Sequence, residues 1–206
     1  MIRSVISDLG KVLLWFDNDI FIRKLAAHCG CSVEETKEAA HSNLELIVAF
    51  DKGRISPPEF YERVVKALGA RISREKFFVI YNDVFWLNAR AVEAMKRVKP
   101  NCSRLLLLSN TDPERFGFVK KMFPRILIFD DYILSYELGL AKPEPEIFRE
   151  AVRRAGCPAD ECAFIDDLPE NVEAAVSLGA KGVLYTPTTD LVAELSRLGL
   201  VFKDQR

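Results

Sequence analysis

Short apolar runs alternate along this chain with helix-length stretches, and this alternation restricts the fold more than any other feature. Four runs are typical of buried strands: residues 2–7, 104–109, 162–166 and 181–185. Between them lie helical stretches such as 145–156 and 169–180, which carry a glycine at or near their ends, a usual stop signal. Near-continuous apolar strands separated by helices indicate a parallel sheet covered on both faces. We therefore predict an α/β fold with a doubly wound, Rossmann-like parallel sheet.

One segment, from about residue 18 to residue 85, breaks this alternation because it shows only successive helical patterns. Ser32 and Glu35 have the spacing of a capping box, in which each side chain bonds the other residue's backbone amide. Ser56 precedes prolines that are favoured in the first turn of a helix. About four helices are too many for one crossover connection. We predict that residues 17–86 form a helical cap domain inserted into a core domain of residues 1–16 and 87–206.

The composition argues against several classes of protein. The formal net charge of the 206 residues is −1, which gives no sign of the basic excess typical of nucleic-acid or membrane binding. The five cysteines are scattered without paired spacing, so we expect neither a disulfide framework nor a zinc site. No signal pattern and no apolar run of about 20 residues is present. We expect a cytoplasmic monomer or homodimer that acts on a small molecule, with no nucleic-acid or membrane partner.

Polar residues stand where several predicted strands end. In open α/β sheets, ligands bind at the carboxyl ends of the strands, so residues that follow the strands are the first candidates for a site. A further candidate is a lysine just before the helix that begins near residue 145. The candidates are Asp8, Ser109, Asn110, Lys142, Asp166 and Asp167. We expect them to converge on one crevice.

These side chains suggest phosphoryl transfer. Three clustered carboxylates repel one another unless a cation lies among them, and their hard oxygen ligands suit Mg²⁺. A carboxylate can also act as a nucleophile and pass through an acyl phosphate, while a lysine offsets charge between nucleophile and phosphate. Each residue alone has a structural alternative: Asp8 as a turn residue, the segments after residues 109 and 166 as helix starts, and Lys142 as a surface residue. The occurrence of the whole set in order favours a site.

The set resembles the haloacid dehalogenase superfamily, a group dominated by magnesium-dependent phosphatases. Its four motifs are matched here by "SDLGKVL", "LLLLSNT", "GLAKPEPEIF" and "AFIDDLPENV", and the helical insert stands where the family's first type of cap belongs. The resemblance covers nearly the whole chain. It implies a fold with a Rossmann-like core and a helical cap, magnesium as the cofactor, and hydrolysis of a small phosphorylated substrate.

The resemblance also implies a role for each matched residue. Asp8 corresponds to the nucleophile, Lys142 to the charge-neutralising lysine, and Ser109 and Asn110 to the groups that bind phosphate. The magnesium ligands it implies are Asp8, the backbone carbonyl of Gly10, Asp166 and Asp167.

Gly10 departs from the family's usual pattern, because most of its phosphatases carry a second aspartate there as general acid and base. The family's dehalogenases, like this chain, have no acid at that position. Unlike this chain, however, they do not have the magnesium-binding acid pair that "FIDDLPEN" provides. The "DLG" opening is similar to a subgroup of sugar-phosphate phosphatases and to the phosphatase domain of epoxide-hydrolase-like proteins. Asp17, Lys11 or a leaving group of low basicity are the alternatives for the missing proton donor.

Three functions follow, in decreasing order of support. The first is a magnesium-dependent hydrolase of small, sugar-phosphate-like monoesters that forms an aspartyl phosphate on Asp8. The second is a catalytically weak protein that keeps the magnesium and phosphate sites for regulation, and the third is a 2-haloacid dehalogenase. For the hydrolase, the loop "FDKGRIS" of the cap is expected to face the substrate, and Arg54 in that loop is the candidate contact.

Overall fold

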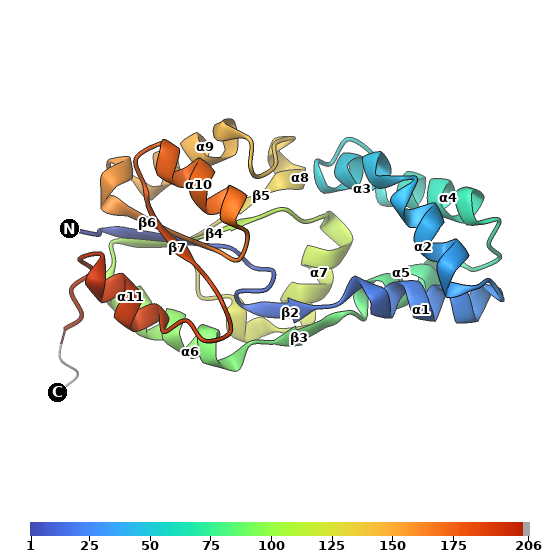
Figure 1. The fold of residues 1–206 in the computed structure, drawn as a ribbon, viewed down its shortest axis with the longest axis horizontal. Coiled ribbons are helices and arrows are strands. Elements are labelled where there is room, and N and C mark those ends of the chain that lie inside the picture. Colours follow the sequence, from blue (N-terminus) through green and yellow to red (C-terminus); the bar gives the residue numbers. More distant parts are fainter. Residues whose placement is uncertain (204–206) are drawn as a thin grey trace.

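The centre of the protein is a five-stranded parallel sheet with the strand order β5-β4-β1-β6-β7, seen in a computed structural model that describes residues 1–203 (Figure 1). The strands are β1 (Ser4–Ser7), β4 (Arg104–Ser109), β5 (Asp131–Leu134), β6 (Cys162–Asp166) and β7 (Lys181–Leu184). The predicted α/β class and parallel sheet are confirmed. Strand β5, which pairs with β4 at one edge of the sheet, was not predicted.

Helices cover both faces of this sheet, and an apolar cluster fills the space on each side. Helices α9 and α10 lie on one face, while α6 and α11 lie on the other (Figure 1). The helices of this part are α6 (Ala89–Val98), α7 (Pro113–Met122), α8 (Ser135–Leu138), α9 (Pro145–Ala155), α10 (Pro169–Ser177) and α11 (Leu191–Arg197). Short 3₁₀ turns are η1 (Lys99–Asn101), η2 (Pro124–Ile126) and η3 (Ala159–Glu161).

A second group of helices is inserted between two short strands that pair antiparallel, β2 (Leu14–Phe16) and β3 (Phe85–Leu87). Five helices form it, one more than expected: α1 (Asn18–Cys29), α2 (Val33–His41), α3 (Leu44–Asp51), α4 (Pro57–Leu68) and α5 (Arg74–Asn82). The capping box of Ser32 and Glu35 is present, with both reciprocal bonds formed. We propose that this group acts as the cap domain, with the boundaries given above.

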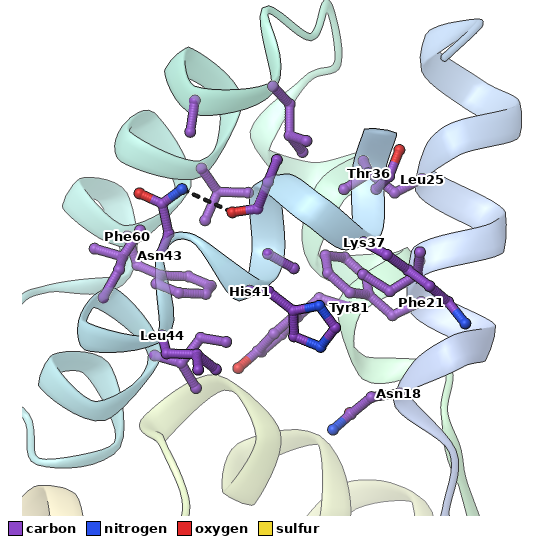
Figure 2. A pocket seen from close by; sticks show the side chains of 18 of the residues that line it. Asn18, Phe21, Leu25, Thr36, Lys37, His41, Asn43, Leu44, Phe60 and Tyr81 are labelled. Carbon is purple, nitrogen blue, oxygen red and sulfur yellow. Dashed lines mark hydrogen bonds between the residues drawn. The ribbon is translucent and has the colours of Figure 1, made fainter. Parts of the chain in front are cut away.

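The inserted helices have an apolar core of their own, in which the rings of Phe50 and Phe60 stack with centroids 4.2 Å apart. They also enclose a cavity of about 440 Å³ that is lined mainly by apolar side chains. Figure 2 shows Phe21, Leu25 and Phe60 around this cavity, with His41 and Tyr81 beside them. None of the candidate site residues lines it, and Arg115 of α7 borders it from outside the inserted helices. In the described part of the chain, no helix is long and apolar enough to cross a membrane.

Buried polar side chains join the helical group to the start of α7. The hydroxyl of Tyr81 donates to Asp112 Oδ2 over 2.8 Å, and the guanidinium of Arg115 lies 4.2 Å from the centre of the Tyr81 ring. Asp51 lies close to this group. Burial, together with the nearby charge of Asp112, raises the pKa of Asp51 to about 7, although Arg115 acts in the opposite direction. The folded protein therefore holds a proton on Asp51 more tightly than the unfolded chain does.

This pKa leads to a prediction for Asp51→Asn. An unfolded Asp titrates near pH 4, so the contribution of the Asp51 carboxyl to stability is full below about pH 4. It falls as the pH rises to about 7, because the folded state must then give up its proton. The free energy of unfolding of Asp51→Asn, measured with urea, should therefore rise relative to that of the wild type across this range and level off above it. A difference that does not change with pH contradicts the prediction, and Asp160→Asn at an exposed position is the control.

Candidate active site

Lys142 lies between two buried carboxylates at the carboxyl end of the sheet. Its Nζ is 2.6 Å from Asp8 Oδ1 and 2.6 Å from Asp166 Oδ2. Asp8 follows β1 directly and Asp166 is the last residue of β6, and these two strands are parallel neighbours. The side chains of Lys142 and Asp166 are 3% and 0% exposed, and that of Asp8 is 10% exposed. The structure thus brings together three residues that are far apart in the sequence.

Burial makes the charges of this group costly. It raises the pKa of Asp8 to about 7; Lys142 lowers that pKa and Asp166 raises it. Burial alone would lower the pKa of Lys142, but the charges of Asp8 and Asp166 outweigh it and the pKa is raised. The pKa of Asp167 is also raised, first by burial and then by Asp166. Lys142 pairs with two of the three carboxylates, and among the described residues only the positive charges of Lys142 and Lys11 act on Asp167, so the group favours a further cation.

The carboxylates are placed to hold such a cation. One oxygen from each of Asp8, Asp166 and Asp167 lies within 4.8 Å of the others. Hard divalent cations bind several carboxylate oxygens at once, and Mg²⁺ commonly takes only one or two of them together with water and substrate oxygens. The donor set therefore fits magnesium. The role of the Gly10 carbonyl as a further ligand stays a prediction, although Gly10 lies beside Asp8.

The side chain of Asp166 is fixed by more than Lys142. Its Oδ1 accepts a hydrogen bond from the backbone amide of Leu168 over 3.0 Å and another from Asn171 Nδ2 over 2.9 Å. Asn171 is buried near the start of α10. These bonds hold the carboxylate in one orientation, with Oδ2 toward the lysine. Asn171 was not predicted as a site residue; its only signal in the sequence is an amide side chain in the first helical turn after the acid pair.

Asn110 holds the backbone of Lys142 rather than its side chain. Asn110 Nδ2 donates to the carbonyl of Lys142 over 2.8 Å, and the amide of Lys142 donates to Asn110 Oδ1 over 2.8 Å. The neighbouring Ser109 is buried at the end of β4, and its hydroxyl donates to the Asn110 carbonyl over 3.5 Å. Both polar atoms of the Asn110 side chain are therefore bonded to the backbone of Lys142. Phosphate binding by the Ser109 hydroxyl and by the Asn110 amide stays a prediction.

An aromatic ring fills the space beside Gly10 where a second carboxylate would stand. A Cβ added to Gly10 would lie 2.9 Å from Cε1 of Phe16 and 3.8 Å from Asp8 Oδ2. The left-handed conformation in this turn belongs to Lys11, with φ of 57°, and not to Gly10. Lys11 Nζ donates to the carbonyl of Phe16 and lies 4.6 Å from the centre of its ring. Asp17 accepts from the amide of Asp19 as the N-cap of α1.

Arg54 is exposed in the loop between α3 and α4, and it borders a surface groove together with residues of α3. No contact joins it to the carboxylates, and its role in substrate binding stays a prediction. The residue of this loop that reaches the sheet domain is Lys52, whose Nζ forms an ion pair with Glu144. Neither residue of this pair was predicted to belong to the site.

Comparison with known proteins places this geometry in a family. D-ribitol-5-phosphate phosphatase of Bacteroides thetaiotaomicron is 24% identical over 189 residues, which cover 87% of this chain and 89% of that protein. Drimenol cyclase drtB of Aspergillus calidoustus is 24% identical over 202 residues, or 96% of this chain, but this chain spans only 37% of its length.

A crystal structure of a HAD family enzyme from Bacteroides thetaiotaomicron superposes with a TM-score of 0.85 at 27% identity, covering 94% of this chain and 98% of that one. A complex of that enzyme with magnesium and inorganic phosphate gives a TM-score of 0.77 at 25% identity, over 94% of this chain and 99% of that one. The model of the haloacid dehalogenase-like hydrolase family matches residues 73–179, just over half of the chain. This protein belongs to the haloacid dehalogenase-like hydrolases.

Proposed function

We propose that this hydrolase cleaves small phosphate monoesters with the help of magnesium and forms a phosphorylated intermediate on Asp8. The observation that carries the proposal is the buried contact of Lys142 with both Asp8 and Asp166, next to Asp167. A phosphate ester brings further negative charge into this group, so both the lysine and a divalent cation are needed to bind it. The related enzyme that binds magnesium and inorganic phosphate supports this interpretation.

Asp8, Asp166, Asp167 and the Gly10 carbonyl are the groups that would hold magnesium. The bound ion would neutralise carboxylate and phosphate charge, which lowers the cost of bringing the two together. Lys142 is fixed at its backbone by Asn110 and at its Nζ by Asp8, so its charge stays at one position. Ser109 and the Asn110 amide would bind phosphoryl oxygens at the end of β4. These roles are proposals for residues that the fold has already brought near one another.

The reaction has two displacements. An oxygen of Asp8 attacks phosphorus while the bond from phosphorus to the ester oxygen breaks, and the leaving oxygen takes the electron pair and a proton. Water then attacks the phosphorus of the aspartyl phosphate, which releases inorganic phosphate and restores the Asp8 carboxylate. The leaving oxygen needs a proton donor, and Gly10 supplies none. Asp17 and Lys11 already have structural roles: Asp17 is the N-cap of α1, and Lys11 donates to the carbonyl of Phe16.

A leaving group of low basicity fits this site best, because it departs without strong acid assistance. The anomeric oxygen of a sugar 1-phosphate is of this kind, and we propose sugar-phosphate-like monoesters as the substrates. The relative that acts on D-ribitol 5-phosphate supports the general class. The space taken by Phe16 beside Gly10 also favours the alternative, a protein that binds magnesium and phosphate but turns over slowly. A dehalogenase is disfavoured, because it has no use for the acid pair of Asp166 and Asp167.

Asp8→Asn tests the nucleophile. Asn has nearly the same shape and its Oδ1 can still accept from Lys142, but it does not form an acyl phosphate, so turnover should fall by a factor on the order of 10⁴ or more. Steady-state hydrolysis of p-nitrophenyl phosphate with magnesium measures the change, and the thermal unfolding midpoint checks the fold. Asp160→Asn, at an exposed position outside the site, is the matched control. Full activity of Asp8→Asn excludes the covalent step.

Removal of the divalent cation should abolish turnover and lower thermal stability. A ligand that binds only the folded state stabilises it by about 2.7 kcal/mol at a hundredfold excess over its Kd. Calorimetric scans with EDTA and with increasing magnesium measure this shift, and Asp167→Asn should reduce it. Hydrolysis by the EDTA-treated protein that is as fast as with magnesium contradicts the proposed function.

Gly10→Asp restores a carboxylate at the position of the missing acid. The Phe16 ring must move to admit it, so the variant should be made together with Phe16→Leu, and Phe16→Leu alone is the control. General acid assistance is typically worth about 10²–10⁴-fold. The rate on a sugar phosphate should therefore rise at least about tenfold more than the rate on p-nitrophenyl phosphate, whose leaving group needs no proton. An unchanged ratio of the two rates in a folded, magnesium-binding variant shows that the acid is not limiting.

A further inference from the structure

The loop between α3 and α4 docks on the segment that carries Lys142. Ser135 Oγ donates to the carbonyl of Asp51, which links the end of α3 to the start of α8. Gly53 has φ of 62°, and a Cβ there would overlap the carbonyl oxygen of Tyr136. Only a glycine allows this close approach of the two backbones. Residue 52 is thereby held facing the sheet domain.

Lys52 completes this contact with an ion pair to Glu144. The side chain of Lys52 is 10% exposed and that of Glu144 is 38% exposed, so the pair is partly removed from water. The hydrogen bond that Lys52 donates is the main cause that holds the pKa of Glu144 below its usual range. By contrast, the pair of Arg63 and Glu59 in α4 is 57% and 41% exposed. Exposed pairs contribute little, whereas partly buried ones resist screening by solvent.

Glu144 also belongs to the Lys142 segment. While its Oε1 pairs with Lys52, its Oε2 accepts from the backbone amide of Ala141 over 3.2 Å. The same carboxylate thus joins the cap loop to the residue that precedes Lys142. From the other side, Asn110 binds the amide and carbonyl of Lys142. The backbone around Lys142 is therefore held by two side chains. One is that of Asn110, and the other is that of Glu144, which is itself paired with Lys52 of the loop between α3 and α4.

We propose that the ion pair of Lys52 and Glu144 positions Lys142 between Asp8 and Asp166 when the cap loop is docked. Lys52 is a positioning residue that acts through Glu144 and does not contact the substrate. The inference rests on the proposed function, because it gives Lys142 its role in the reaction. Within the loop, Lys52 forms the ion pair with Glu144, whereas Arg54 is exposed and only its charge acts on Glu144.

Kinetics of Lys52→Met, Glu144→Gln and the double variant test the proposal on p-nitrophenyl phosphate with magnesium. A misplacement of about 1 Å can cost up to about 10²-fold in rate, so we expect kcat to fall about tenfold in each single variant with KM changed less than threefold. The double variant should lose no more than either single variant, and Lys52→Arg should keep most of kcat. Arg63→Met, which breaks the exposed pair in α4, is the matched control and should leave kcat unchanged.

Amide hydrogen exchange of residues 139–144 gives a second readout that needs no turnover. Exchange there should quicken in both single variants, should quicken no further in the double variant, and should not change in Arg63→Met. Additive losses of kcat, a rise in KM at constant kcat, or unchanged exchange in Lys52→Met overturns the proposal. If the wild type hydrolyses no phosphate ester, the proposed function fails, and the exchange measurements still decide whether the pair holds the Lys142 segment.

Discussion

The structure of this site depends on one ammonium group held between two buried carboxylates. Asp8 and Asp166 reach the same edge of the sheet because β1 and β6 are parallel neighbours, with Ser7 paired to Ile165. Two buried carboxylates so close together would be strongly unfavourable without a positive charge. Lys142 supplies it, and its place in turn requires a fixed backbone, which Asn110 provides. The surrounding hydrogen bonds therefore follow from the need to keep this charge in position.

Much of the core could be predicted from the sequence, because buried parallel strands consist of nearly continuous apolar residues. The runs that contain β1, β4, β6 and β7 stand out, and the polar residues after them mark the binding edge. Strand β5 could not be recognised, because Asp130 and Asp131 interrupt the apolar pattern at its start; β7 is an edge strand of the same length, and it was predicted. The pairing of β2 with β3 was also missed. Each has only three residues, and their register depends on helices inserted between them.

The contacts that hold the site are harder to predict than its members. Asp8 and Lys142 stand in recognisable motifs, whereas the contact of Glu144 with Lys52 joins residues that are 92 positions apart, and Asn171 has no motif beyond its place five residues after Asp166. The loop "DKGR" shows the difficulty, because its sequence led to Arg54 as the candidate contact and gave no reason to name Lys52. The choice between them is made by the left-handed turn at Gly53 and its close packing on α8, a tertiary constraint.

The packing around Gly10 leaves no room for a larger side chain unless the Phe16 ring moves. The Phe16 ring fills the space that a carboxylate at residue 10 would need, and Lys11 Nζ donates to the backbone carbonyl of Phe16. The Asp8 side chain is 10% exposed, and such burial strengthens the charge interactions within the site. If Asp8 is the nucleophile, the chain has a well-held phosphate site and no side chain committed to the leaving oxygen. Selection among substrates then depends on the basicity of that oxygen as well as on the shape of the cap. Under the proposed mechanism, such a site would discriminate through the chemistry of the leaving group, and the docked loop between α3 and α4 would keep Lys142 in the position that the first displacement requires.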